Sequence, residues 1–146
     1  MPHSDMTLTC IKEDSSKINI NLLIYAFENP PSLVLDCNNA SNPHFLFPYI
    51  ALEKLDSVYI IEIELIYKLR DTLKVTRNIV KQLEIKTIVI TPFNKLFNYN
   101  NEKENYQVLL HSWELIRNLS FNYDVVVGIK DKFNEKIASR FCKNFS

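Results

Sequence analysis

The scarcest residue in this sequence is glycine, since only Gly128 occurs among the 146 residues. A loop that wraps the phosphates of a nucleotide needs backbone without a Cβ in the way and with access to positive φ angles. A glycine-rich phosphate loop of any known pattern therefore cannot be built from this chain. We expect no catalytic nucleotide site and no cofactor.

Signatures of metal sites and of thiol chemistry are missing as well. The three cysteines, Cys10, Cys37 and Cys142, show no CxxC spacing, which predicts free thiols in a reducing compartment. The histidines are scattered without the spacing of metal ligands, at His3, His44 and His111. The sequence contains no Gly-x-Ser-x-Gly elbow for a nucleophilic serine. These absences predict a protein that is not an enzyme and holds no metal.

A strong net charge and long apolar runs are also absent. The 17 Lys and Arg residues balance the 17 Asp and Glu residues, so the formal net charge is zero. Zero net charge argues against a surface that attracts nucleic acid everywhere and leaves room only for a local basic patch. No run reaches the ~18 apolar residues of a transmembrane helix. The N-terminal residues MPHSDMT lack the apolar core of a signal peptide, so we expect no membrane partner.

What the sequence does contain is an alternation of strand and helix patterns. With 47% apolar residues it can bury one core, which predicts a single domain over 1–146 with a flexible N-terminus at 1–6. Apolar runs predict strands at 7–11, 33–36, 57–63, 87–91 and 124–129. Helical spacing predicts helices at 17–27, 48–55, 65–83, 104–119 and 133–142. The predicted fold class is α/β, a parallel sheet of about five strands flanked by helices.

The segment 33–44, which reads LVLDCNNASNPH, is the most informative stretch. Its apolar run ends in Asp36 and a polar turn follows, which is typical of a strand buried on both faces. Such a strand delivers Asp36 and Asn38 to the carboxyl end of a parallel sheet. Open α/β sheets place their ligands at that end, so a binding site is expected there.

The order and spacing of these motifs resemble the RecA/RadA recombinase core over residues 8–129. In that family the second strand ends in Asp-x-Glu, and the Glu is the base that activates water for ATP hydrolysis. Asn38 stands in its place here. The family's Walker B strand ends in an Asp that orients magnesium, and Thr91 stands at that position. The resemblance therefore implies a truncated RecA-like core with degenerate ATPase motifs.

The Walker A position resembles the family in order but not in chemistry. A strand, a polar loop and a helix follow one another, and Lys17 falls on the Walker lysine. The two glycine positions and the hydroxyl position that holds magnesium are occupied by Ile11, Ser16 and Ile18. All catalytic positions fail together, which implies a pseudo-ATPase. Shortened eukaryotic recombinase paralogues, including subunits of the Shu-complex type, have this character.

The resemblance implies a non-catalytic accessory subunit. Such a subunit would assemble with a paralogous recombinase-like protein and support homologous recombination and DNA repair on single-stranded DNA in the nucleus. In the family, loops after the fourth and fifth strands approach DNA, and the matching loops here are 93–107 and 130–140. Their stacking and phosphate-binding candidates are Lys95, Phe97, Tyr99, Lys103, Tyr106, Lys130, Lys132, Lys136 and Arg140. Zero net charge predicts weak DNA binding by this subunit alone.

Several alternatives stay open on the sequence. The family's sheet order of first, fifth, fourth, second and third strand would leave the first strand as an uncovered edge. An unrelated receiver-like domain would instead place its first strand next to its third, and a thioredoxin-like scaffold for protein contacts is a further possibility. The chain could also be a degenerate but still nucleotide-binding ATPase of the RecA family, with Lys17 retained for the phosphates. In the two loops, the aromatic residues could simply fold back on the core.

Overall fold

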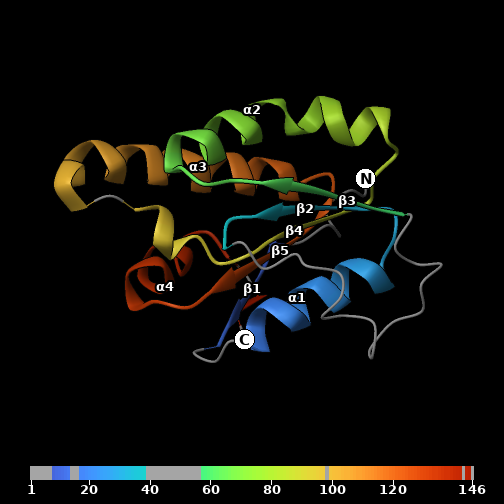
Figure 1. Cartoon of the computed structure of the whole chain (residues 1–146), viewed down its shortest axis with the longest axis horizontal. Helices are drawn as coiled ribbons and strands as arrows, with labels where there is room; N and C mark the ends of the chain where they lie inside the picture. The colour runs from blue at the N-terminus through green and yellow to red at the C-terminus, as the bar shows by residue number, and fades with distance from the viewer. Residues whose placement is uncertain (1–7, 14–16, 39–56, 98, 143, 146) are drawn as a thin grey trace.

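The computed structural model describes residues 8–13, 17–38, 57–97, 99–142 and 144–145. Strands and helices alternate along these residues, which confirms the predicted α/β class (Figure 1). The strands are β1 Leu8–Lys12, β2 Ser32–Asp36, β3 Val58–Glu62, β4 Thr87–Ile90, β5 Asp124–Ile129 and β6 Asn144–Phe145. The α-helices are α1 Lys17–Glu28, α2 Ile66–Gln82, α3 Glu102–Ser120 and α4 Lys132–Ala138. The helix predicted at 48–55 and the N-terminus at 1–6 lie outside the described residues.

All neighbouring strands of the sheet run parallel, in the order β3-β2-β4-β5-β1-β6. The order of β1 to β5 is the one that the resemblance implies. Because β1 lies between β5 and β6 and not beside β3, the receiver-like alternative is wrong. β5 has the predicted bounds, since its run of valines is buried almost throughout.

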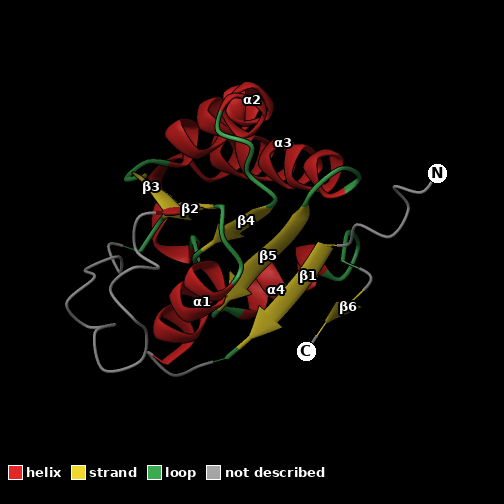
Figure 2. Ribbon diagram, turned by 90° about the vertical axis from the view of Figure 1, so that its right-hand side faces the viewer, coloured by secondary structure: helices red, strands yellow, loops and turns green. Residues whose placement is uncertain are grey.

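The connections place α1 on one face of the sheet and α2, α3 and α4 on the other (Figure 2). The chain crosses from β1 to β2 in one direction, and from β3 through β4 to β5 in the opposite direction. Right-handed crossovers then put the connecting helices on opposite faces. On the α1 face, Leu22 and Phe27 belong to a cluster with Val34 of β2. The larger cluster, on the other face, contains Leu109 and Trp113 of α3.

The long helices bury the faces that their spacing predicts. The buried residues of α2 include Leu69, Leu73, Thr76 and Val80, whereas Leu83, just after the helix, is 37% exposed. The expected inward residues of α3 are all buried: Leu109, Trp113, Ile116 and Leu119. β3 is the most exposed of the five longer strands, as its polar end suggested, because it lies at the edge of the sheet.

The single glycine lies where α1 packs closely on the sheet. A Cβ on Gly128 would lie 2.5 Å from Cδ1 of Leu22 and 2.9 Å from Cδ of Pro92. We expect Gly128→Ala to lower the free energy of unfolding by about 1–3 kcal/mol, because the added methyl overpacks this contact. Urea unfolding measures the loss. The same substitution should cost less in a Leu22→Ala background, and an equal cost in both backgrounds would contradict this explanation.

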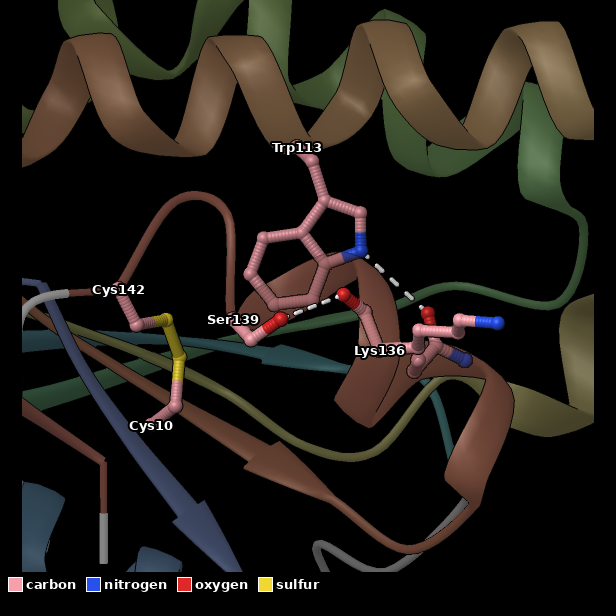
Figure 3. Close-up of a disulfide and its surroundings, with 6 residues drawn as sticks. Cys10, Trp113, Lys136, Ser139 and Cys142 are labelled. Atoms are coloured by element: carbon pink, nitrogen blue, oxygen red, sulfur yellow. Dashed lines mark hydrogen bonds between the residues drawn. A yellow bond between two sulfur atoms is a disulfide. The ribbon is translucent and has the colours of Figure 1, made fainter.

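Three expectations that involve the C-terminal part of the chain are wrong. Cys10 in β1 and Cys142 after α4 form a disulfide, whereas the sequence predicted free thiols (Figure 3). β6 pairs with Thr9 and Cys10, so the β1 edge is partly covered. The last helix ends at Ala138 and not at 142, which lets the following residues turn back to β1. The two cysteines are 132 residues apart in the sequence, so no spacing rule could have paired them.

Candidate functional site

The Thr91 hydroxyl ties together the carboxyl ends of β2 and β4. Its Oγ1 accepts a 2.7 Å hydrogen bond from the backbone N–H of Cys37. The backbone N–H of Thr91 donates to the carbonyl of Leu35 at 3.1 Å, and the side chain of Thr91 is fully buried. At the Walker B position the hydroxyl is therefore used as a hydrogen-bond acceptor for the backbone after β2. A neutral hydroxyl cannot supply the negative charge of the Walker B carboxylate near magnesium.

Thr91→Val is expected to lower the free energy of unfolding by about 1–3 kcal/mol, because the buried N–H of Cys37 loses its acceptor. The matched control is Thr91→Ser, which keeps the hydroxyl. NMR-detected hydrogen exchange should show the Cys37 amide protected in the wild type and in Thr91→Ser but not in Thr91→Val. Full protection in the valine variant would show that this hydrogen bond is not the tie between the strands.

Asn38 belongs to a small polar network at the end of β2. Its backbone N–H donates to Oδ1 of Asp36 at 3.1 Å, and its Nδ2 donates to Oδ1 of Asn19 in α1 at 3.2 Å. The Asp36 side chain is 1% exposed. An amide cannot take up a proton at neutral pH, so Asn38 fixes the turn after β2 and cannot act as a general base.

The first Walker glycine position lies inside strand β1 and not in a phosphate loop. Ile11, at the first Walker glycine position, pairs with Gly128 inside the β1–β5 ladder. The ladder continues to Glu13, whose N–H donates to the carbonyl of Ile129 at 3.1 Å. Lys17 is the first residue of α1, and its side chain is exposed. Because the backbone at Ile11 is committed to the sheet, it is not available to cradle phosphates.

Cys37 is a free cysteine, as predicted, and its side chain is 3% exposed. Burial, and to a lesser degree the nearby Asp36 carboxylate, raises the pKa of the Cys37 thiol well above its usual range. The thiolate is the nucleophilic form of cysteine, so this thiol is inert at neutral pH. Cys37 is therefore a packing residue.

An open pocket of about 580 Å³ lies between the loop after β4, the start of α3 and the start of α4. It is lined by Phe97, Glu102, Lys103, Tyr106 and Phe133. The lining residues come from the two segments that follow the carboxyl ends of β4 and β5, which are neighbours in the sheet. The pocket thus lies at the edge of the sheet where α/β folds commonly bind ligands.

Three aromatic rings shape this pocket. The Phe133 centroid lies 5.2 Å from that of Phe97, in an edge-to-face arrangement, and 5.9 Å from that of Tyr106. Phe97 is only 8% exposed and packs on the core, whereas Phe133 is 37% exposed. Aromatic pairs in this geometry support one another. Phe97 therefore forms the buried wall of the pocket, and Phe133 is its most exposed ring.

The position of Phe133 depends on how α4 is held. Asp131 caps this helix by accepting a 3.2 Å hydrogen bond from the backbone N–H of Asn134. The buried Asn134 side chain accepts a 3.3 Å hydrogen bond from Nε1 of Trp113 in α3. A helix of 7 residues is not stable by itself, so these contacts set where the Phe133 ring points.

Three of the predicted loop residues line the pocket, and the others do not. Phe97, Lys103 and Tyr106 line the pocket. Four predicted cations are exposed without lining it: Lys95, Lys132, Lys136 and Arg140. Lys130 is half-buried, and the side chain of Tyr99 lies outside the described part of the chain. The expectation that the loop aromatics stack on a ligand therefore needs a correction for Phe97, because this ring is nearly buried in the core.

Sequence reasoning missed Glu102 and Phe133 as pocket residues. The spacing of Phe133 with Ile137 favours an inward-facing residue, and Ile137 is indeed 3% exposed. Phe133 lies one turn earlier on the same face of α4, and at that position the face lines the pocket and not the core. An aromatic residue in the first turn after a strand-end loop was the signal that could have found it.

Comparison with known proteins finds no family model that matches the chain and no curated protein that matches its sequence. Among the described residues, no helix is long and apolar enough to cross a membrane. Nor do those residues contain a group of three or more His, Cys, Asp and Glu side chains arranged to hold a metal ion.

Proposed function

We propose that this chain is a non-catalytic, recombinase-like accessory subunit that binds single-stranded DNA at its aromatic pocket and supports homologous recombination and DNA repair. The proposal rests on one observation: the segments that follow β4 and β5 line the same pocket, and Phe133 in this pocket is partly exposed. The strand order supports it, because β4 and β5 lie side by side, as the resemblance to the recombinase core implies. The ATPase positions are degenerate, which supports a subunit that binds DNA without catalysing ATP hydrolysis.

A base of the DNA stacks on Phe133 in this proposal, with Tyr106 beside it. Stacking of a base on an aromatic ring contributes about 1–3 kcal/mol and tolerates any sequence. The pocket volume of about 580 Å³ is within the range of sites that hold small ligands. One exposed ring can stack on one base, with a neighbouring base beside it. The binding site on DNA is therefore expected to cover few nucleotides.

The DNA phosphates lie on the cationic side of the pocket. Lys103 is in the wall, and Lys132 and Lys136 are exposed on α4. Glu102, also in the wall, repels phosphate and directs the DNA backbone towards α4. Because the net charge is zero, few counterions are released on binding, which makes the affinity low and its dependence on salt shallow.

The subunit does not hydrolyse ATP in this proposal. The Thr91 hydroxyl is bonded to backbone, Asn38 is an amide, and Ile11 lies within a strand ladder. Phosphoryl transfer depends on positioned phosphates and neutralised charge, for which these groups are unsuited. The alternative is a nucleotide-binding role through Lys17. Isothermal titration with ATP and magnesium separates the two, since micromolar affinity would favour the alternative.

A paralogous recombinase-like protein is the proposed partner, in a hetero-oligomer located in the nucleus. β1 is partly covered by β6, whereas no described strand lies beyond β3. Tyr59 of β3 is 40% exposed. Edge strands present unpaired backbone groups that a partner's strand can bind, so β3 is the edge offered to the paralogue.

Fluorescence anisotropy with a labelled single-stranded oligonucleotide tests the DNA-binding proposal. Phe133→Ala is expected to weaken binding about 5- to 100-fold, which corresponds to the loss of one stacked base. Phe121→Ala is the matched control, because Phe121 is 56% exposed but lies just beyond the other end of α3. Equal affinities of the two variants, or preference for duplex over single-stranded DNA, would contradict the proposal.

A further inference from the structure

The segment after α4 contacts α3 at one point and β1 at two, and Figure 3 shows the disulfide among these contacts. Phe141 stacks on Trp113, with ring centroids 6.1 Å apart and planes 16° apart. Cys142 is bonded to Cys10 of β1. Beyond the disulfide, β6 pairs with Thr9 and Cys10. We refer to residues 141–142 and 144–145 as the C-terminal strap.

The first attachment does not depend on the disulfide. Arg117 belongs to α3, and its guanidinium carbon lies 5.4 Å from the centre of the Phe141 ring. The backbone N–H groups of Phe141 and Cys142 donate to the carbonyl of Ala138 at 2.9 and 2.8 Å. These contacts anchor the start of the strap to α3 and α4 whether or not the two sulfurs are bonded.

The far end of the strap is held much less firmly. β6 is a strand of 2 residues, with one register pair at Thr9 and one at Cys10. So short a ladder has little stability of its own. The covalent bond at Cys142, next to β6 in the chain, is therefore what keeps this strand beside β1.

We propose that the Cys10–Cys142 disulfide is a redox latch, which keeps β6 on the edge of β1 when oxidised and frees that edge when reduced. Cys10 is fully buried and Cys142 is half-buried, so a reductant reaches the sulfur of Cys142 first. One thiolate of a dithiol reductant bonds to that sulfur and displaces the Cys10 thiolate. The second thiol of the reductant then displaces the Cys142 thiolate. Two electrons pass to the protein, and the reductant becomes a disulfide.

Opening the latch changes the sheet at one edge only. With β6 released, β1 remains paired with β5, while its other side presents free N–H and C=O groups. Cys37 does not compete in the exchange, because it is buried at the end of β2, in a different strand. The latch does not depend on the proposed DNA binding.

Hydrogen exchange measured by mass spectrometry, on oxidised and dithiothreitol-reduced protein, tests the latch. We expect the peptide covering β1 to exchange at least about tenfold faster after reduction, as a local opening rather than global unfolding. The peptide around Trp113 should not change, and reoxidation should restore slow exchange at β1. Thiol titration of the unfolded protein, without reductant, should find one free thiol among the three cysteines.

Two variants complete the test. Cys142→Ser should exchange at β1 like the reduced wild type, with or without reductant. Cys37→Ser should still respond to reductant as the wild type does. Unchanged exchange at β1 after verified reduction would overturn the latch, and so would acceleration spread evenly over the whole chain. Three titratable thiols in the unreduced protein would overturn it as well.

Discussion

Replacing Trp113 by alanine is expected to lower the free energy of unfolding by about 3–5 kcal/mol. Trp113 is fully buried and is the only tryptophan in the chain. Its ring lies 5.5 Å from that of Phe93 and stacks on Phe141, so it joins α3 to the loop after β4 and to the C-terminal strap. The substitution would leave a large cavity at this junction and remove the donor that Asn134 needs.

Urea unfolding followed by far-UV circular dichroism measures this loss, since tryptophan fluorescence disappears with the residue. Trp113→Phe is the matched control, because it keeps a ring but lacks the N–H that bonds Asn134. We expect the phenylalanine variant to lose about 1–2 kcal/mol. A loss of less than about 1.5 kcal/mol in Trp113→Ala would contradict a central packing role, given the usual cost of such truncations.

Loss of the Cys10–Cys142 bond is the second large effect that we expect. The bond joins residues 132 positions apart, so it restricts the unfolded chain strongly. Cys142→Ser, or reduction of the wild type, should lower the free energy of unfolding by about 2–4 kcal/mol. This global loss reflects the unfolded state, whereas exchange at β1 reports on release of the strap in the folded state.

Urea unfolding with and without dithiothreitol measures the effect of the bond. The wild type should fall to the stability of Cys142→Ser when reductant is added, and the variant itself should not respond. If the wild type unfolds at the same urea concentration with and without reductant, the disulfide contributes nothing to stability. This stability prediction would then be wrong, whereas the latch is tested by exchange at β1.

The sequence predicted most of the sheet because its strands are unusually apolar. β2 and β5 are buried almost throughout, so each appears in the sequence as a continuous apolar run that ends at a polar residue. The alternation of these runs with helical patterns implied parallel strands, and the strand order followed from the resemblance. The ends of the three longer helices differed by a residue or two, as helix boundaries commonly do, whereas the last helix ended four residues earlier than predicted.

The parts that the sequence did not predict depend on contacts between distant residues. The pairing of Cys10 with Cys142 and of β6 with β1 exists only once the sheet has formed. The role of Thr91 as an acceptor for Cys37 likewise depends on β2 and β4 being neighbours. Phe133 has the spacing of a core residue, and its exposure depends on where α4 meets the loop after β4.

The central claim is that the pocket at the carboxyl ends of β4 and β5 holds single-stranded DNA. Photocrosslinking with an oligonucleotide that contains 5-bromodeoxyuridine, followed by mass spectrometry of the crosslinked peptides, tests it most directly. We predict crosslinks at Phe133, the exposed ring of the pocket, or at the half-buried Tyr106 beside it. Crosslinks confined to α2, where Lys68, Lys74 and Lys81 are exposed, would contradict the claim. The absence of any crosslink under conditions of measured binding would contradict it as well.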